Sequence, residues 1–186
     1  MKSVLISIQP YWVFLIIAKT MGWNIGKKKA VEVRKNYPKD ENWDKVAKIY
    51  CSKDNKSFAK IPKEYQPLME QFLGKVIGEF VCDCIISHCE MANADIAEQQ
   101  GCIKREMLFE YSNGKELFGW HISNLVIYDN PRELSEFKKE CNGICLNTKK
   151  RINCERFLKE GFSCDNLKPL KRPPQSWCYV ESEVQV

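Results

Sequence analysis

The sequence predicts an α+β domain built on a small, partly closed β-barrel with flanking helices. Three observations lead to this prediction. Several short segments alternate apolar and polar residues or are rich in β-branched residues, as strands are. Segments of helical length with proline or glycine at their ends separate them. The repeated strand–helix alternation and glycine-rich phosphate loop of a Rossmann fold do not occur.

The N-terminal half is expected to begin with a strand. Residues 4–9 alternate between apolar and more polar side chains, and Pro10 can occupy the first turn of a helix. The apolar residues 11–21 then predict that helix, with Gly22 as its end. The next expected elements are strands at residues 30–35 and 46–51 and a short helix at residues 62–72.

The C-terminal half contains the longest strand signal, residues 75–87. Helical segments are expected within residues 91–109, with a break at Gly101, and a strand within residues 120–128. The remaining expected elements are one or two helical turns at residues 132–139 and a last strand at residues 176–180, after two prolines.

The composition is that of a globular protein of one domain, residues 1–186, with 44% hydrophobic and 28% charged residues. The longest apolar run, residues 11–18, is well short of the ~20 residues of a membrane-spanning helix. Gln9 and Pro10 interrupt the apolar stretch at the start, and no signal-peptidase site follows it. The sequence therefore predicts a cytoplasmic protein whose ten cysteines are free, buried or metal-bound rather than paired in disulfides.

Charge changes sign along the chain. Residues 1–78 contain 15 basic and 7 acidic residues, residues 79–136 contain 4 and 11, and residues 137–186 contain 10 and 6. A basic face suits phosphates, whereas an acidic face suits a basic protein groove or imitates nucleic acid. The alternative is a solvated surface on which the three blocks cancel.

The late cysteines have the spacing of a metal site. Cys141, Cys145, Cys154 and Cys164 predict a closed structural zinc site, with Cys178 or His121 as possible replacements for one ligand. Residues 138–172 would form a cysteine-rich zinc-knuckle insertion before the last strand, with the metal supplying its folding energy. The alternative is a loop with unrelated cysteines. The earlier cysteines, at positions 51, 82, 84 and 89, are interpreted as core residues, with a second metal site as the less favoured interpretation.

Residues 27–35 form another candidate site, in addition to the late cysteines. On a strand, Glu32 and Arg34 share one face and Lys29 the other. Arg34 and Glu32 could form an exposed ion pair, or Arg34 could bind a phosphate. Burial could lower the pKa of Lys29 and make it a nucleophile or base.

A second candidate is the pair Trp120 and His121 on a predicted strand. Core packing is the simpler interpretation. In the alternative, the indole stacks on a base and the imidazole binds the edge of that base.

Three segments together resemble the ASCH family of PUA-like small β-barrels: residues 27–34, 118–123 and 172–181. Lys29, Glu32 and Arg34 match the lysine, glutamate and arginine of the GxKxxExR signature, while Lys27 stands at its glycine position. The resemblance is greatest to the longer members found in phages and mobile elements of Gram-positive bacteria.

This resemblance implies recognition of RNA or a modified nucleoside. Some members resemble amidohydrolases of N-acetylated cytidine, and others are linked to RNA cleavage. Their working lysine corresponds to Lys29, but Glu32 stands where their partner threonine falls, so it could neutralise the lysine. Phage proteins of this type without a complete catalytic set can also inhibit CRISPR nucleases.

Two functional hypotheses follow. In the first, a monomer in the prokaryotic cytoplasm, away from membranes, docks on RNA or a ribonucleoprotein, and its sharpest form is an inhibitor of an RNA-guided CRISPR effector nuclease. Its contact residues would be Lys28, Lys29, Arg34, Trp120, His121 and Arg172. In the second, the protein is an ASCH-type amidohydrolase or ribonuclease that uses Lys29 and Glu32, with Arg34 and His121 beside them.

Overall fold

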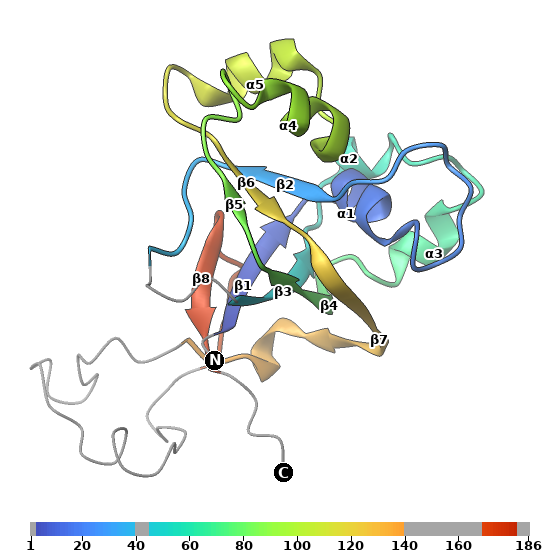
Figure 1. The fold of residues 1–186 in the computed structure, drawn as a ribbon. Coiled ribbons are helices and arrows are strands. Elements are labelled where there is room, and N and C mark those ends of the chain that lie inside the picture. The colour runs from blue at the N-terminus through green and yellow to red at the C-terminus, as the bar shows by residue number, and fades with distance from the viewer. Residues whose placement is uncertain (1–2, 40–44, 140–168, 182–186) are drawn as a thin grey trace, which may run out of the picture.

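The structure is a computed structural model that describes residues 3–39, 45–139 and 169–181. It is a mixed α+β fold, as predicted, with two sheets and helices around them (Figure 1). The five-stranded sheet has the order β7-β4-β3-β1-β8 and comprises β1 (Ser3–Ile8), β3 (Lys45–Cys51), β4 (Lys75–Cys82), β7 (Ser123–Glu133) and β8 (Trp177–Val180). The three-stranded sheet has the order β2-β6-β5 and comprises β2 (Val31–Arg34), β5 (Ile85–Ile86) and β6 (Phe118–His121).

In Figure 1, α4 and α5 lie above the sheets, α1, α2 and α3 lie to the right, and the 3₁₀ helix η1 lies below, after β7. They are α1 (Pro10–Ile17), α2 (Asn55–Phe58), α3 (Gln66–Glu70), α4 (Ala94–Gly101), α5 (Arg105–Ser112) and the 3₁₀ helix η1 (Leu134–Glu136). Among the described residues, no helix has the length and apolar content to cross a membrane.

The core is divided between the two faces of β1. Val4, Ile6 and Ile8 pack with α1 in the main cluster, whereas Leu5 packs with a second cluster that includes Val180. Since β1 is hydrogen-bonded to β3 on one side and β8 on the other, both faces and both edges of this strand are covered. The parallel pairing of β1 with β3 requires a crossover, which includes α1 and β2.

Two short connections link the five-stranded sheet to the three-stranded sheet. Only Asp83 and Cys84 separate β4 from β5, and only Ile122 separates β6 from β7. The antiparallel pairing of β4 with β7 is thus followed by that of β5 with β6. The strand predicted at residues 75–87 is therefore broken after Cys82, and the one predicted at 120–128 begins earlier and ends later.

The prediction of a barrel needs correction, because the described strands do not close into one. At the edge of each sheet, β2 and β8 are linked by side chains instead of a ladder of backbone hydrogen bonds. Both Trp120 Nε1 and Trp177 Nε1 donate to Asn36, the first to its backbone oxygen at 3.2 Å and the second to its Oδ1 at 2.9 Å.

The other differences from the sequence concern helix boundaries. The helix expected at 11–21 ends at Ile17, and the helix expected at 62–72 is reduced to Gln66–Glu70. The helical turns expected at 132–139 shrink to Leu134–Glu136, because β7 continues to Glu133. The break expected at Gly101 is confirmed, with Cys102 in the left-handed region at φ 56°.

The predicted zinc-knuckle insertion falls largely outside the described residues, and Cys141, Cys145, Cys154 and Cys164 all lie there. Its two ends lie side by side, because Lys138 forms a bridge with Pro169 and Lys139 with Val180.

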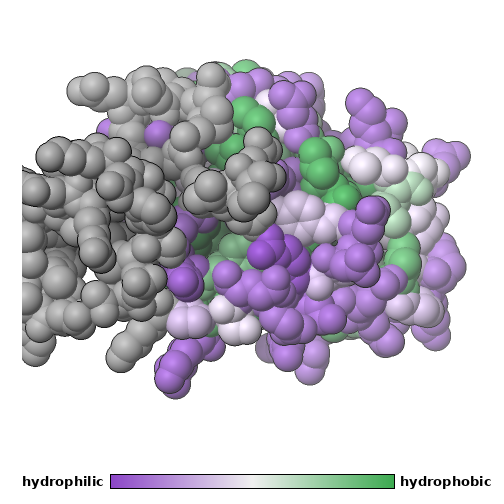
Figure 2. Space-filling view, turned by 90° about the horizontal axis from the view of Figure 1, so that it is seen from below, coloured by the Kyte–Doolittle hydropathy of each residue, from purple (hydrophilic) through white to green (hydrophobic). Residues whose placement is uncertain are grey.

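Figure 2 views the molecule from below and shows hydrophilic side chains mixed with smaller hydrophobic patches.

Candidate functional site

A pocket of about 410 Å³ lies beside β2 and α1. We call it the Lys29 pocket. Its lining residues come from five segments of the chain: Ser7, Gln9, Trp12, Lys29, Glu32, Val33, Arg34, Ser52, Asp54, Ile103, Met107, Tyr111 and Gln175. Its volume lies within the range of about 300–1,000 Å³ that is usual for small-molecule sites.

Two local patterns place these side chains. In β2, Glu32 and Arg34 are two residues apart and so share one face, as predicted. Ile103, Met107 and Tyr111 are spaced by four residues at and within α5, which puts them on one side of that helix. Lys29 reaches the same pocket although strand alternation would put it on the opposite face, because it precedes the strand and does not follow its pleat.

Lys29 is buried, and intramolecular partners surround its ammonium group. Its Nζ donates to the backbone oxygen of Gly101 at 2.7 Å, lies 3.4 Å from Glu32 Oε2, and lies 4.9 Å from the centre of the Trp12 ring. Burial lowers the pKa of Lys29, and the Glu32 carboxylate partly opposes this shift. The residue therefore has the lowered pKa that the sequence suggested, but its ammonium group is bonded within the protein.

Arg34 lines the pocket and has one guanidinium nitrogen without a hydrogen-bond partner in the described structure. Its Nη2 lies 3.0 Å from Glu32 Oε1 and also donates to the backbone oxygen of Ser7. Arg34 is only 8% exposed, and Glu32 is buried as well. The alternative of an exposed ion pair, considered from the sequence, is therefore wrong. Arg34 Nε and Ser52 Oγ are buried without a hydrogen-bond partner. Buried polar groups are normally bonded, so both call for a partner such as a ligand or water.

The charges that line the Lys29 pocket balance. Lys29 and Arg34 are cationic, and Glu32 and Asp54 are anionic. Asp54 also accepts from Ser57 N at 2.8 Å and from Gln9 Nε2 at 3.2 Å, which fixes its carboxylate at the start of α2. This set of groups suits a polar ligand without net charge better than it suits a phosphate.

Aromatic rings contribute to the pocket wall from two helices. Trp12 lies on α1 and Tyr111 near the end of α5, where Lys35 Nζ lies 4.8 Å from the centre of its ring. Rings of this kind provide stacking surfaces for planar ligands such as nucleobases.

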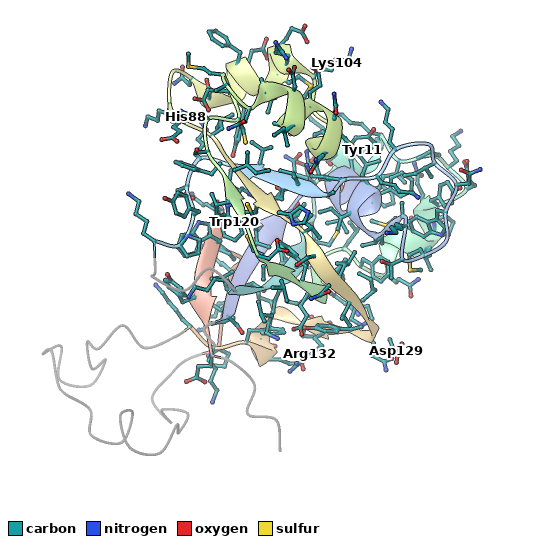
Figure 3. The ribbon with its side chains drawn as sticks, in the orientation of Figure 1. Tyr11, His88, Lys104, Trp120, Asp129 and Arg132 are labelled. Atoms are coloured by element: carbon teal, nitrogen blue, oxygen red, sulfur yellow. The ribbon has the colours of Figure 1, made fainter. Side chains whose placement is uncertain are left out.

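The structure does not bring the other predicted contact residues into this pocket. Trp120 is fully buried, with its ring 6.0 Å from that of Trp177, in keeping with the core-packing interpretation. His121 Nδ1 is hydrogen-bonded to Asp83 Oδ1 at 2.6 Å, which lowers the pKa of that carboxyl. Figure 3 shows Trp120 in the middle of the molecule. Lys28 and Arg172 are exposed and do not line the Lys29 pocket.

The described part of the chain contains no cluster of three or more His, Cys, Asp or Glu side chains arranged to hold a metal. Cys51, Cys82 and Cys89 are buried, in keeping with their interpretation as core residues, whereas Cys84 is exposed. Cys141, Cys145, Cys154 and Cys164 lie outside the described residues, whereas the possible replacements Cys178 and His121 are described.

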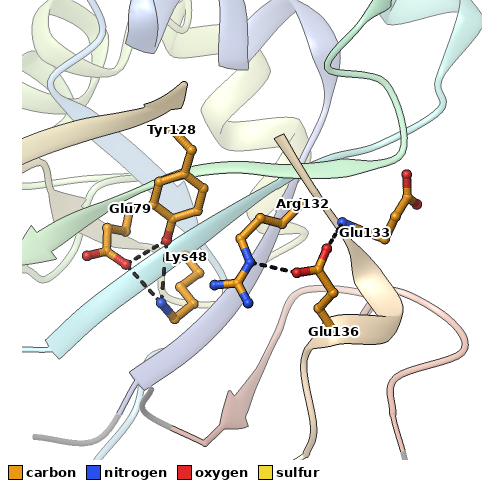
Figure 4. Close-up of polar contacts among 6 residues, drawn as sticks. All are labelled: Lys48, Glu79, Tyr128, Arg132, Glu133 and Glu136. Atoms are coloured by element: carbon orange, nitrogen blue, oxygen red, sulfur yellow. Dashed lines mark hydrogen bonds and ion pairs between the residues drawn. The ribbon is translucent and has the colours of Figure 1, made fainter. Parts of the chain in front are cut away.

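The acidic residues of 79–136 do not form one face. Five of the eleven form ion pairs with lysine or arginine: Glu79, Asp95, Glu98, Glu133 and Glu136. Asp83, Glu90 and Glu116 instead lie beside His121 or His88, which are charged only when protonated. Glu79 accepts from Lys48 Nζ at 2.9 Å and from Tyr128 Oη at 2.7 Å, near the Arg132–Glu136 pair (Figure 4). Asp95 and Glu98 instead pair with Arg105 on the α4–α5 side. The block is therefore divided, and five of its members are paired with cationic side chains.

Sequence reasoning missed most of the pocket wall. Trp12, Ile103, Met107 and Tyr111 are apolar or aromatic, so they read as core positions in the sequence. The helical segments expected within residues 91–109 stop short of Tyr111, so the helix face that Tyr111 shares with Met107 was not predicted. Asp54, three residues before Ser57, carried an N-cap signal that could have placed it at the start of a helix.

No protein family and no curated protein matches this sequence. The fold is similar to solved structures of an ASCH protein from Zymomonas mobilis. One is 16% identical, with a TM-score of 0.48, and the match covers 96% of this chain and 87% of that chain. Structures of its serine-to-alanine and tyrosine-to-phenylalanine variants are 15% and 14% identical, each covering 96% of this chain, with 87% and 90% of those chains and TM-scores of 0.48 and 0.46.

Proposed function

We propose that this protein binds single-stranded RNA and takes one nucleobase into the Lys29 pocket. The observation that carries the proposal is the buried Arg34 Nε, which lacks a partner within the described structure and belongs to a residue of the pocket wall. A base carbonyl or ring nitrogen would accept from it, and a base amino group would donate to Asp54 or Ser52. The balanced charge of the wall favours the neutral base over a phosphate in this position.

The ASCH resemblance of the signature residues supports the same function. Lys29, Glu32 and Arg34, which match that signature, all line the pocket. Lys29 and Glu32 hold Arg34 in place through the shared carboxylate, so these residues would serve to orient the base-reading donor.

The proposal is tested by binding of fluorescent single-stranded RNAs of roughly 10 nucleotides, with the four nucleosides as competitors. Tyr111→Ala removes a partly exposed ring from the wall and should weaken binding by about 1–3 kcal/mol, roughly 5- to 150-fold. Ser52→Ala should weaken it less, because it removes one hydroxyl.

The matched control is Phe109→Ala, on the same helix. Phe109 is 71% exposed and does not line the pocket, so its removal should leave RNA affinity unchanged. Equal affinities for the wild-type protein, Tyr111→Ala and Arg34→Lys would reject the pocket as a base-binding site.

A ribonucleoprotein partner is a narrower form of this proposal, with an RNA-guided CRISPR effector nuclease as its sharpest version. The phage-type resemblance supports it, but the divided acidic block gives it no separate docking face. Its test is a pull-down from a prokaryotic lysate that contains such an effector, with and without ribonuclease. A protein partner that survives ribonuclease supports direct docking, whereas loss of the partner supports RNA reading.

An ASCH-type hydrolase is the second candidate, and the lowered pKa of Lys29 favours it. A lysine whose pKa is lowered gives up its proton more readily and can act as a base. The bonds from Lys29 to Gly101 and Glu32 oppose this role, because they hold the ammonium form. Turnover of N-acetylated cytidine or of single-stranded RNA that Lys29→Ala abolishes would establish the enzyme. No turnover at high protein concentration would favour the binding module.

A further inference from the structure

Two further hollows continue from the Lys29 pocket along the surface. The first, of about 300 Å³, shares Ile103 with the pocket and is lined by residues 26–28 and by the α4–α5 connection. The second, of about 520 Å³, shares Gly26 and Lys28 with the first and is lined by residues of the loop after α1. The three hollows therefore follow one another across this side of the molecule.

The two outer hollows differ from the Lys29 pocket in charge. Four exposed lysines line them, Lys19, Lys27, Lys28 and Lys104. Their acidic member is Glu98, whose carboxylate lies 3.9 Å from Arg105 Nε. None of the four lysines forms an ion pair with another described residue. Figure 3 shows Lys104 at the top of the molecule, away from the sheets.

We propose that these two hollows hold the sugar-phosphate backbone of the nucleotides next to the base in the Lys29 pocket. The inference rests on the proposed function and narrows its substrate class to an oligonucleotide rather than a free nucleoside. Unpaired lysines attract phosphates without reading sequence, whereas the charge-balanced pocket reads the base. The shared residue Ile103 places the two kinds of surface in contact.

Trp23 supports this assignment, because its ring belongs to the outermost hollow and is half-buried there. It stacks on Phe14 with ring centres 5.4 Å apart, and lies 4.9 Å from Tyr65. A ring fixed by two aromatic neighbours beside Lys19 and Lys28 offers a surface on which a second base can stack.

The test measures RNA affinity as a function of salt for the triple variant Lys27→Gln/Lys28→Gln/Lys104→Gln. The probes are a single-stranded RNA of roughly 10 nucleotides and the nucleoside cytidine. For each phosphate that the variant no longer neutralises, the slope of log affinity against log salt should fall by roughly 0.7. Cytidine affinity should stay unchanged. The matched control is Lys115→Gln/Lys171→Gln, at exposed lysines outside the three hollows.

The outcomes separate the two proposals. The proposal that the outer hollows hold the RNA backbone is overturned if the slope of log affinity against log salt is unchanged in the triple variant. It is also overturned if the control variant lowers this slope by as much per substituted lysine. If Tyr111→Ala then still weakens RNA binding, the pocket function stands. A reduced slope with no effect of Tyr111→Ala retains the backbone proposal and rejects the pocket. Failure of RNA to bind at all overturns both and directs the lysines to an acidic protein surface.

Discussion

Lys29 Nζ donates a hydrogen bond across 2.7 Å to the backbone oxygen of Gly101, the last residue of α4. The last carbonyl groups of a helix lack intrahelical partners and carry partial negative charge. The buried lysine thus closes the end of α4, while its neighbour Ala30 donates from its backbone N to Gln100 at 2.8 Å. The lysine of the signature therefore holds the α4–α5 pair beside the pocket.

The first prediction concerns this lysine. Lys29→Met removes the bond to Gly101 and one partner of Glu32, which remains paired with Arg34. We expect the free energy of unfolding to fall by about 2–3 kcal/mol, measured by urea denaturation.

A double-mutant cycle with Glu32→Gln isolates the ion pair. Because the two side chains interact directly, the double variant should lose less than the sum of the single variants, with a coupling of about 0.5–3 kcal/mol. Strict additivity would contradict an energetic link between the two groups.

The sequence predicted the elements that have strong local signals. The strands at β1, β2, β3 and β8 and the break at Gly101 were anticipated, because alternation and glycine are local features. The grouping of Glu32 with Arg34 was anticipated for the same reason. The split of residues 75–87 was not anticipated, because the change of partner after Cys82, from β7 to β6, depends on the second sheet.

The pocket itself depends on contacts between distant segments. Ser52, Tyr111 and Gln175 lie far apart in the sequence, and no periodicity connects them. The arrival of Lys29 on the same side as Glu32 also depends on the loop before β2, which α1 and α4 hold through backbone hydrogen bonds to Leu15 and Gln100. Such long-range placement leaves no pattern in a single sequence.

The second prediction concerns stability at alkaline pH. Burial raises the pKa of the Cys51 and Cys82 thiols to about 12 each, from an ordinary value near 9.0. Both thiols are protonated in both states below about pH 9, so their contribution is fully present there. Above it the unfolded chain loses these protons first, so stability falls as pH rises toward about 12, by about 1.4 kcal/mol per pH unit for each thiol.

Cys51→Ala should make this alkaline decline shallower by one thiol's share, measured by urea denaturation from pH 8 to pH 11. Val13→Ala is the control, since it removes apolar volume from the same cluster without removing a titrating group. It should lower stability equally at each pH. Parallel pH profiles for Cys51→Ala and the wild-type protein would refute this assignment.

The third prediction concerns Gly78, at the bulged pairing of β4 with β7. A Cβ at this position would lie 2.2 Å from the backbone oxygen of Val126, which cannot move without opening the sheet. Gly78→Ala should lower the free energy of unfolding by about 1–3 kcal/mol, as overpacking does.

Gly101→Ala is the matched control for Gly78→Ala. Its Cβ would meet Val33 Cγ2 at 3.4 Å, an ordinary contact, so its effect should stay within about 1 kcal/mol. If both variants lose the same free energy of unfolding, the close approach of the β7 backbone is not the reason that position 78 requires glycine.

The fourth prediction concerns the zinc site proposed for Cys141, Cys145, Cys154 and Cys164, which lie outside the described residues. The purified protein should contain close to one zinc per chain by elemental analysis, because four thiolates form a closed tetrahedral site. A chelator should lower Tm by about 5 °C or more, since metal binding supplies folding energy.

The variant Cys145→Ser should lose the metal, whereas Cys84→Ser, at an exposed thiol among the described residues, should keep it. If Cys164→Ser retains zinc while Cys178→Ser loses it, the fourth ligand is Cys178, which then brings the metal to β8. Metal-free protein with a Tm that does not respond to chelator would leave the four cysteines as unrelated thiols. The bridges of Lys138 to Pro169 and Lys139 to Val180 would then close this segment without a metal.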